Sequence, residues 1–381
     1  MTGTSIGWGI LGTGRIARLF APDVRLVPGH RLAAVGSRDA ARARAFAGAL
    51  SIPGSHGSYA DLVADPEVDV VYVATPHPAH RDACLLALDA GKAVLCEKPF
   101  AMTAAEAAEV AAAARVRDRF AMEGMWTRFF PAMTALRRWL DEGAIGEVTT
   151  LHAGFGFRAP WDPDDRLLNR ELGGGALLDL GVYAVSLAHF VLGPPAEVTA
   201  LAEYGATGVD ETTTVLLRAA SGALATLSCS LRTELPTEAT VCGSRGRIGL
   251  GDPFWRPTRL RLQSIPDPDA ARARASPSWR DRLGAELRVQ SQRLSAKSRT
   301  AARLLPPLKR FGKRLLGVRT ERTAHFRHRG HGFHYEIAEV GRCLREGLRE
   351  SPLMPLDETV AVMRTLDRVA ELTQRGIRTR R

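Results

Sequence analysis

A lysine directly after an apolar stretch, and an aspartate and a tyrosine four residues apart, are the residues of this chain whose types suggest chemistry. Lys98 lies in the segment CEKPF, and Asp179 and Tyr183 lie in GGGALLDLGVYAV. If a helix begins after the three glycines, Asp179 and Tyr183 share one face with Ser186 and could line one pocket. A carboxylate, a phenol and an ammonium group together can exchange a proton with a hydroxyl group.

This set suits the oxidation of a carbinol, in which a base takes the hydroxyl proton while a hydride leaves the carbon. An unperturbed tyrosine has a pKa of about 10 and is poorly matched to neutral pH. A lysine roughly 4 Å from the phenol, at an effective dielectric of about 20, favours the phenolate by up to about 4 kcal/mol. Should Lys98 and Tyr183 meet, we therefore expect the pKa of Tyr183 to fall to about 7. Either of them could be the immediate proton acceptor.

The first residues of the chain predict the element that positions a cofactor. The segment SIGWGILGTGRIARLF is an apolar run, a glycine turn and a helix. Gly12 allows the tight turn, Gly14 lets a pyrophosphate approach the backbone, and the small Ala17 allows close helix packing. The residues expected to bind the dinucleotide at this turn are Gly12, Thr13, Gly14, Arg15 and Ile16.

Further strands alternate with helices in the first third of the chain. HRLAAVGSR, DVVYVATP and AVLCEKP are strand-like segments with helical stretches between them, which predicts a doubly wound parallel sheet of the Rossmann type. The second strand ends in Ser37 and Arg38, where NAD sites usually carry an acidic residue. A hydroxyl and a guanidinium suit a 2′-phosphate, so we expect NADP, with NAD less favoured although Asp39 follows.

The rest of the chain predicts a second domain of another kind. Residues 146–158, 196–203, 211–219 and 223–232 are rich in apolar and β-branched residues between turn residues. TTTVLLRAASGALATLSCSL, which spans two of these segments, is typical of a β-hairpin.

Several motifs resemble those of the Gfo/Idh/MocA oxidoreductase family, namely GILGTGRIA, VATPHPAH, EKPF, MWTRFFP and GGGALLDLGVYAV. Within that family the chain is similar to the NADP-dependent trans-dihydrodiol and D-xylose dehydrogenases. The resemblance implies an α/β fold with a Rossmann domain over residues 1–125. It also implies an α+β substrate domain over 126–381, with an open, mostly antiparallel sheet and a C-terminal helix that packs back.

The resemblance also implies roles for individual residues. Lys98, Asp179 and Tyr183 correspond to the family's catalytic positions, with tyrosine in place of the commoner histidine. The loop after the third strand and the EKP motif would lie near the nicotinamide, which adds Thr75, Pro76, His77, His80, Glu97 and Lys98 to the cofactor site. Weaker candidates for substrate contacts are Trp126, Arg128, Arg158 and His334.

Composition limits the other functional classes. The chain has 381 residues, 45% of them hydrophobic, and five cysteines without Cys-x-x-Cys spacing, which favours a globular protein of the reducing cytoplasm over a disulfide framework or a zinc knuckle. The formal net charge is +11, and residues 267–322 account for nearly all of it with 15 Lys/Arg and 5 Asp/Glu. We interpret this segment as a basic insertion, with a short amphipathic helix over residues 306–317.

Such an insertion could contact an anionic membrane surface or an acidic partner. Because the positive charge is concentrated in this one segment, nucleic-acid binding is a poor explanation for it. His325, His328, His331 and His334 are spaced by three, but glycines interrupt the segment and no metal site is expected. The sequence therefore predicts a homo-oligomeric NADP-dependent dehydrogenase or reductase of a sugar, cyclic polyol or vicinal diol. The alternative is a non-catalytic dinucleotide sensor or an adaptor that uses the basic segment.

Overall fold

The computed structural model describes residues 5–265 and 320–378, and its first layer is a six-stranded sheet. The strands are all parallel, in the order β3-β2-β1-β4-β5-β6. Their bounds are β1 Ile6–Leu11, β2 His30–Gly36, β3 Gly54–His56, β4 Val70–Val73, β5 Ala93–Glu97 and β6 Ala121–Gly124. This order is that of a dinucleotide-binding sheet and confirms the predicted doubly wound fold.

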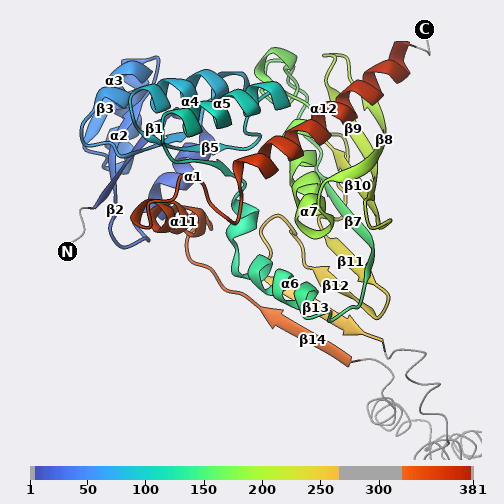
Figure 1. The fold of residues 1–381 in the computed structure, drawn as a ribbon. Helices are drawn as coiled ribbons and strands as arrows, with labels where there is room; N and C mark the ends of the chain where they lie inside the picture. The colour runs from blue at the N-terminus through green and yellow to red at the C-terminus, as the bar shows by residue number, and fades with distance from the viewer. Residues whose placement is uncertain (1–4, 266–319, 379–381) are drawn as a thin grey trace, which may run out of the picture.

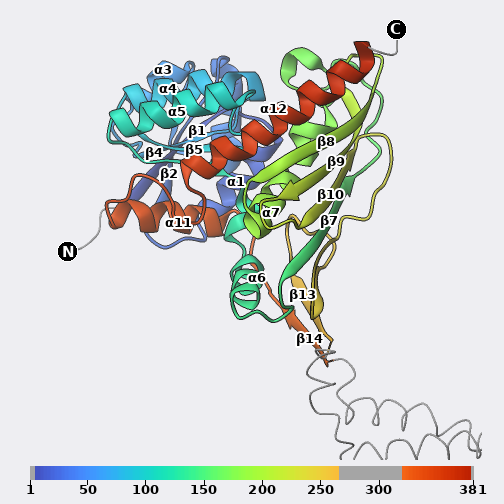
Figure 2. The ribbon, with the colours of Figure 1, turned by 45° about the vertical axis from the view of Figure 1, so that its right-hand side comes forward.

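Helices cover both faces of this sheet, which explains why its central strands are apolar throughout. β4 has the sequence VVYV and all four residues are buried, as expected for a parallel strand between two helical layers. The helices are α1 Arg15–Val24, α2 Ala40–Leu50, α3 Tyr59–Ala64, α4 His80–Asp89 and α5 Ala104–Val116. In both ribbon views α4 and α5 lie on one face, while α1 and the later helix α11 (His334–Arg345) lie on the other (Figures 1 and 2).

A second sheet of eight strands forms the other half of the molecule, in the order β14-β13-β12-β11-β7-β10-β9-β8. The strands are β7 Val148–Gly156, β8 Pro195–Tyr204, β9 Asp210–Ala219, β10 Leu224–Ser230, β11 Ala239–Gly243, β12 Gly246–Leu250, β13 Arg259–Ser264 and β14 Thr320–His325. β7 and β10 pair in parallel and all other neighbours are antiparallel. The predicted hairpin is β9–β10, so the mixed, mostly antiparallel sheet is confirmed.

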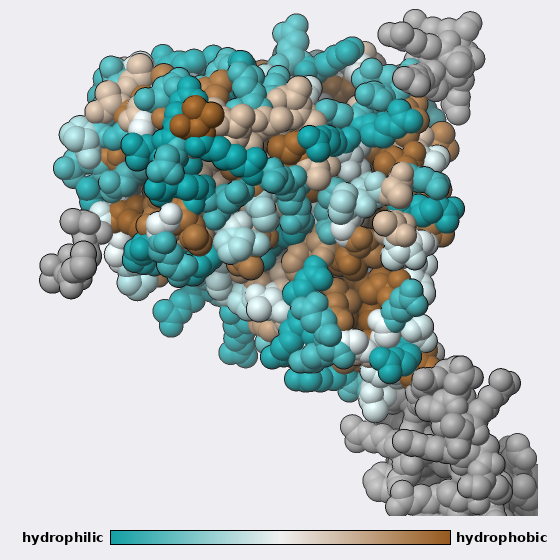
Figure 3. Space-filling view, in the orientation of Figure 1, coloured by the Kyte–Doolittle hydropathy of each residue, from teal (hydrophilic) through white to brown (hydrophobic). Residues whose placement is uncertain are grey.

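One face of the second sheet packs on helix α7 (Val182–Leu192). Alternate residues of β9 from Glu211 to Ala219 are buried, as a strand with one covered face requires. The segment Arg170–Leu192, which includes α7, is long and apolar enough to span a membrane, but 78% of its most apolar window is buried inside the protein. The burial identifies it as a core segment. In the space-filling view, apolar surface residues gather around the position of α7 and β11, while the first sheet's half is mostly polar (Figure 3).

The C-terminal helices tie the two halves together. Helix α12 (Leu356–Arg378) crosses from α5 to β8 (Figures 1 and 2), and the Ala104 backbone N–H donates to the Asp367 carboxylate at 2.8 Å. On the other side, the buried Asp23 carboxylate of α1 accepts backbone N–H groups of residues 331, 332 and 333 at 2.9 to 3.0 Å. Charged acceptors on backbone donors are strong contacts, so the first holds α12 against α5 and the others hold the segment before α11 against α1.

The structure corrects one boundary of the predicted basic insertion. Residues 320–322 belong to β14, where they pair with residues 262–264 of β13. These residues are Thr320, Glu321 and Arg322 of an exposed edge strand, and the charge count alone does not separate them from the basic segment before them. The rest of the segment, including the predicted helix over 306–317, lies outside the described residues, and the predicted division into domains at residue 125 stays a prediction.

Candidate active site

Most predicted site residues lie at one edge of the first sheet because parallel strands bring their carboxyl ends together. Gly12 follows β1, Ser37 follows β2, Thr75 comes shortly after β4, Lys98 directly follows β5, and Trp126 comes two residues after β6. This edge is where open α/β sheets bind ligands. Segments that are up to 114 residues apart in the chain, from Gly12 to Trp126, therefore contribute to one face of the protein.

Lys98 reaches from this edge to the second half of the molecule. Its ammonium donates to the Asp179 backbone oxygen at 2.8 Å and to Asp179 Oδ1 at 3.1 Å, and only 12% of the side chain is exposed. Below it, the buried Glu97 carboxylate accepts from the Lys98 backbone N–H at 3.2 Å and from the Tyr72 hydroxyl. The structure thus brings the EKP motif together with the predicted Asp179.

Asp179 lies in a π-helical turn, Leu177–Gly181, that leads into α7. The helix expected after the glycines is present, but its first turn is widened to a π-turn, and such turns are frequent at functional sites. Burial opposes ionisation of Asp179, but the charges of Lys98 and Arg166 hold the pKa of the carboxyl well below its usual range. Arg166 Nη1 donates to Asp179 Oδ1 at 3.0 Å.

Tyr183 lies beside Lys98, whose ammonium nitrogen is 4.9 Å from the centre of the phenol ring. The expected drop of the tyrosine pKa to about 7 is wrong. Burial raises the pKa of Tyr183 to about 12, and the opposing effect of Lys98 does not offset it. The cost of placing a phenolate in a buried site exceeds the attraction of one ammonium that Asp179 already partly neutralises.

Lys98 is also protonated at neutral pH. Burial lowers its pKa, but the charges of Asp179, Tyr183 and Glu97 outweigh burial and raise the pKa above the ordinary value. The site therefore holds two protons, one on the phenol and one on the ammonium. It is prepared to donate a proton to a developing alkoxide, and in the opposite direction it must first lose one.

A wall of aromatic rings adjoins the proton-bearing groups. Phe155 of β7 and Trp255 stack with centroids 5.5 Å apart, and Trp126 stacks on Trp255 at 5.7 Å. Tyr183 lies 5.7 Å from Phe155 and 6.3 Å from Trp255. The prediction for Trp126 placed it near substrate, and the structure does set it in this wall, but sequence reasoning missed Phe155 and Trp255.

The glycine turn after β1 fits a dinucleotide. Gly12 has φ +106°, and a Cβ there would lie 2.6 Å from the Ala74 carbonyl oxygen, so only glycine is unstrained. Gly14 caps the N-terminus of α1, and a Cβ there would meet no atom within 4 Å. Open space in front of a helix N-terminus suits a pyrophosphate. The neighbouring Thr75 hydroxyl is buried without a hydrogen-bond partner in the described part of the chain, which leaves a donor for a bound group.

Two histidines support the loop after β4. His80 places Nε2 2.9 Å from the Thr75 oxygen and Nδ1 2.8 Å from the Pro99 oxygen, so it bridges that loop and the EKP motif. His77 Nδ1 lies 3.1 Å from the Gly173 oxygen. A carbonyl can only accept, so Nδ1 of His77 carries the proton. Burial lowers the pKa of His77 to about 3, and it is neutral.

The end of β2 carries cations rather than a free carboxylate. Arg38 is exposed. The Asp39 carboxylate is occupied as the N-cap of α2, where it accepts from the Ala41 and Arg42 backbone N–H groups at 2.8 and 3.1 Å. Ser37 Oγ accepts from the Asp39 N–H at 3.2 Å.

Three weaker candidates do not join the Lys98 cluster. Arg128 is buried, donates to Ser186 Oγ at 2.9 Å and pairs with Glu358 at 2.6 Å, so its guanidinium is used in holding α7 and α12. This pairing also takes Ser186 out of the predicted pocket. Arg158 is exposed. His334 Nδ1 faces Asp23 of α1 at 3.7 Å.

The four spaced histidines also separate in space. His325 is on β14, His328 packs against the Phe130 ring at 5.5 Å, and the His331 backbone binds Asp23. Within residues 5–265 and 320–378, no three His, Cys, Asp or Glu side chains gather as metal ligands.

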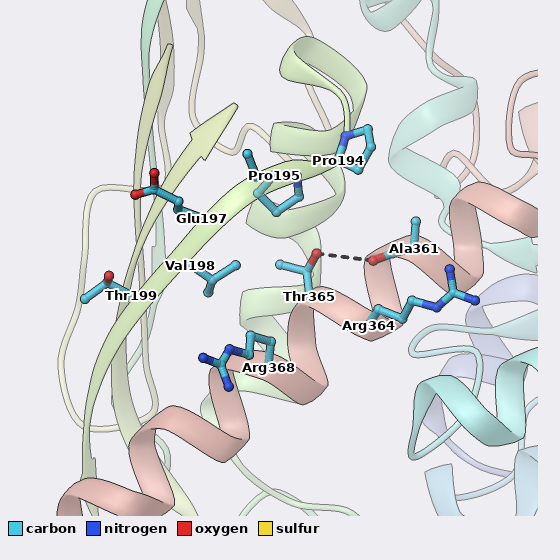
Figure 4. A pocket seen from close by; sticks show the side chains of 10 residues that line it. Pro194, Pro195, Glu197, Val198, Thr199, Ala361, Arg364, Thr365 and Arg368 are labelled. Carbon is cyan, nitrogen blue, oxygen red and sulfur yellow. Dashed lines mark hydrogen bonds between the residues drawn. The ribbon is translucent and has the colours of Figure 1, made fainter. Parts of the chain in front are cut away.

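A cleft of about 600 Å³ lies elsewhere, between β8 and α12. Figure 4 shows Arg368 projecting from α12 toward β8, with Glu197 and Thr199 on the strand, whereas Arg364 points away from the strand. None of the predicted catalytic or cofactor residues lines this cleft. Because chemistry requires the groups gathered around Lys98, we place the active site there.

The fold and the site together define an oxidoreductase that uses a nicotinamide dinucleotide. Residues 6–125 match the family model "Oxidoreductase family, NAD-binding Rossmann fold", and residues 133–249 match the "GFO/IDH/MocA C-terminal domain". The chain belongs to the Gfo/Idh/MocA oxidoreductase family, and it is an NAD(P)-dependent dehydrogenase or reductase.

Individual relatives agree with this assignment. The chain is 36% identical over 369 residues, 96% of each chain, to human trans-1,2-dihydrobenzene-1,2-diol dehydrogenase. Its fold resembles the aldose-aldose oxidoreductase of Caulobacter crescentus, with a TM-score of 0.77, 24% identity and 98% of each chain covered. It also resembles a 3-ketoreductase from Actinomadura kijaniata in complex with NADP, with a TM-score of 0.75 and 24% identity over 97% of this chain and 98% of the other.

Proposed function

We propose that this protein is an NADP-dependent dehydrogenase that transfers a hydride between the nicotinamide and a carbinol carbon of a sugar, cyclic polyol or vicinal diol. The observation that carries the proposal is the contact of Lys98 with Asp179 and with the ring of Tyr183, at the edge of the sheet that also bears the glycine turn. The name of the human relative, a diol dehydrogenase, supports the substrate class.

When bound, the nicotinamide accepts a hydride from the carbinol or delivers one to a carbonyl. The chain's own residues handle the proton. In reduction, the Tyr183 hydroxyl and the Lys98 ammonium face the developing alkoxide and donate to it, and in oxidation the same pair takes the hydroxyl proton. Asp179 fixes the direction of the Lys98 side chain through two contacts. Lys98 and Tyr183 share the proton transfer, so the pKa values seen in a titration of the site belong to both groups together and not to either residue alone.

The aromatic wall gives the substrate a place to lie. Trp126, Phe155 and Trp255 stack on one another and form an apolar wall beside Tyr183. Such a wall contacts the apolar side of a sugar ring or a dihydrodiol and excludes water from the reacting oxygen, which strengthens electrostatic contacts there.

The choice of NADP rests on the end of β2. Asp39 is engaged as a helix cap, so it is a poor acceptor for a ribose hydroxyl. The exposed Arg38 offers a planar fork of donors for a 2′-phosphate, and Arg42 lies one helical turn beyond, 3.6 Å from the Asp39 carboxylate.

We also infer that the protein is a homo-oligomer. Leu201 of β8, Leu216 of β9 and Leu224 of β10 are exposed on the outer face of the second sheet. They occupy diagonal positions on three neighbouring strands, among threonines and Arg218, and large apolar side chains gathered on one exposed sheet face are typical of an interface.

A spectrophotometric screen tests the central proposal. Purified protein is incubated with NADP or NAD and a panel of aldoses, inositols and trans-dihydrodiols, and reduced cofactor is followed by absorbance. We expect NADPH formation with at least one member of the panel, at a rate that exceeds the rate with NAD. The proposal would be contradicted if no panel member led to reduced cofactor, or if the rate with NAD exceeded the rate with NADP.

A further inference from the structure

Arg166 is a charged group at the active site to which the steps above assign no part. It lies on the loop between β7 and the short helix Arg170–Leu172, outside the predicted motifs. Its Nη1 donates to Asp179 Oδ1 at 3.0 Å. Asp179 is nearly buried, with 7% of its side chain exposed, whereas 50% of the Arg166 side chain is exposed. The arginine therefore connects the buried carboxylate to the open side of the site.

The backbone that carries Arg166 is held in place by the glycine-rich segment. A Cβ at Gly174 would lie 2.6 to 2.8 Å from the carbonyl oxygens of Leu167, Arg166 and Asn169, so the segment can approach the loop this closely only as glycine. Leu168, two residues after Arg166, is buried in a small apolar cluster. Close packing at Gly174 thus holds the loop of Arg166 against the segment that carries Asp179.

Two cations share one carboxylate on the open side of the site. Lys98 and Arg166 both lie within 3.1 Å of Asp179 Oδ1. Burial raises the pKa of Glu97 and lowers the pKa of His77, and the charge of Arg166 makes a smaller contribution that lowers both, so its field extends across the site. His77 is neutral and the adjoining wall is aromatic. Besides Asp179, the charge of Glu97 acts on Lys98 and that of Asp165 acts on Arg166, so what sets Arg166 apart is its accessible donors and not an excess of positive charge.

The Arg166 guanidinium still has donors to offer. Arginine carries five N–H donors in a planar fork that matches two anionic oxygens at once. One nitrogen binds Asp179, and the exposed half of the side chain leaves other donors accessible. The contact with Asp179 already restricts the Arg166 side chain, so this side chain loses less conformational entropy when its guanidinium binds a second anion.

We propose that Arg166 is a specificity residue that selects substrates with an anionic group, a carboxylate or a phosphate ester, on the sugar or polyol beside the reacting carbinol. The inference rests on the proposed function, because it places the substrate between the aromatic wall and the Lys98–Tyr183 pair. An anion there forms a two-donor, charge-assisted contact with Arg166. A neutral sugar cannot form this contact.

Three sugars that differ at a single carbon provide the test: galacturonate, galactose 6-phosphate and galactose. Their dissociation constants are measured by calorimetry with the intact protein, with and without NADPH, so that no turnover is needed. We expect at least one anionic sugar to bind at least tenfold more tightly than galactose, a difference of about 1.4 kcal/mol. In Arg166→Gln this ratio falls below threefold while galactose binding is unchanged. Arg166→Lys keeps the charge but not the fork, and gives an intermediate ratio.

Arg170→Gln is the matched control, since Arg170 is an exposed arginine on the adjoining turn, and it leaves the ratio as in the wild type. The proposal is overturned if the wild type shows no tenfold preference for either anion, or if the preference survives in Arg166→Gln. Failure of the hydride-transfer proposal would appear separately, as absent NADPH formation in the screen, because the binding ratios do not depend on turnover.

Discussion

Replacing Lys98 with methionine removes the ammonium group from the centre of the site and keeps the length of the side chain. In the structure this ammonium is almost buried, contacts Asp179 at 2.8 and 3.1 Å and lies 4.9 Å from the centre of the Tyr183 ring. It is therefore placed to stabilise a negative charge on the phenol or on the substrate oxygen. The fold should survive, because Arg166 remains 3.0 Å from the Asp179 carboxylate.

The size of the effect follows from that separation. An opposite charge about 5 Å away, at an effective dielectric of about 20, is stabilised by about 3 kcal/mol. Loss of this stabilisation in the transition state lowers turnover about 100- to 1000-fold. The affinity for NADP should change far less, since the glycine turn after β1 is untouched. Because Arg166 still pairs with Asp179, the free energy of unfolding should fall by less than the roughly 3 to 5 kcal/mol expected when a buried charge loses its partner.

The assay is steady-state kinetics with the best substrate of the screen, alongside fluorescence titration of NADP and thermal unfolding. Lys92→Met is the matched control: Lys92 stands at the opposite end of β5, where its ammonium binds the backbone oxygens of Asp65 and Val68. That variant should keep turnover within about threefold, as expected of a structural contact away from the reacting atoms. A folded Lys98→Met enzyme with near-normal turnover would refute the role assigned to this lysine.

Four other outcomes are expected. Because burial raises the pKa of Tyr183 to about 12, the rate of oxidation should still rise at alkaline pH in a pH–rate profile. Tyr183→Phe should flatten this rise and should lower turnover about as much as Lys98→Met does. Arg38→Ala should reduce a preference for NADP over NAD of about tenfold to near equality in cofactor titrations; equal affinities in the wild type would reject the assignment. The pKa of Asp179 is lower in the folded than in the unfolded protein, so ionised Asp179 stabilises the fold above the unfolded-state pKa of about 4. This contribution to the free energy of unfolding is lost as the pH falls toward the folded-state pKa. The stability of Asp179→Asn should therefore depend less steeply on pH between about 4 and 2 than that of the wild type. Leu201→Glu should shift the protein to a smaller species in sedimentation velocity, and an unchanged monomer in both proteins would contradict the inferred oligomer.

Residue patterns along the chain were sufficient for the framework. The spacing of Gly12 and Gly14 predicted the turn between β1 and α1, and the apolar and β-branched content of residues 211–219 predicted a strand. Lys98 directly after an apolar strand predicted a side chain at the carboxyl edge of the sheet. These features depend on near neighbours in the chain, whose geometry is set by backbone conformation and by the period of a strand or helix.

The properties of the site were decided by contacts between distant segments. No local pattern indicated that Arg166 would share Asp179 with Lys98, that Trp255 would stack on Phe155, or that Arg128 would be used by Glu358. The pKa of Tyr183 shows the reason most clearly. A single nearby charge predicted a fall toward 7, but the value depends on how completely the folded chain removes water from the phenol and on how far Asp179 already satisfies the ammonium. Desolvation is a property of the packed molecule, so the sequence identified the reacting groups and the tertiary structure determined their protonation and their partners.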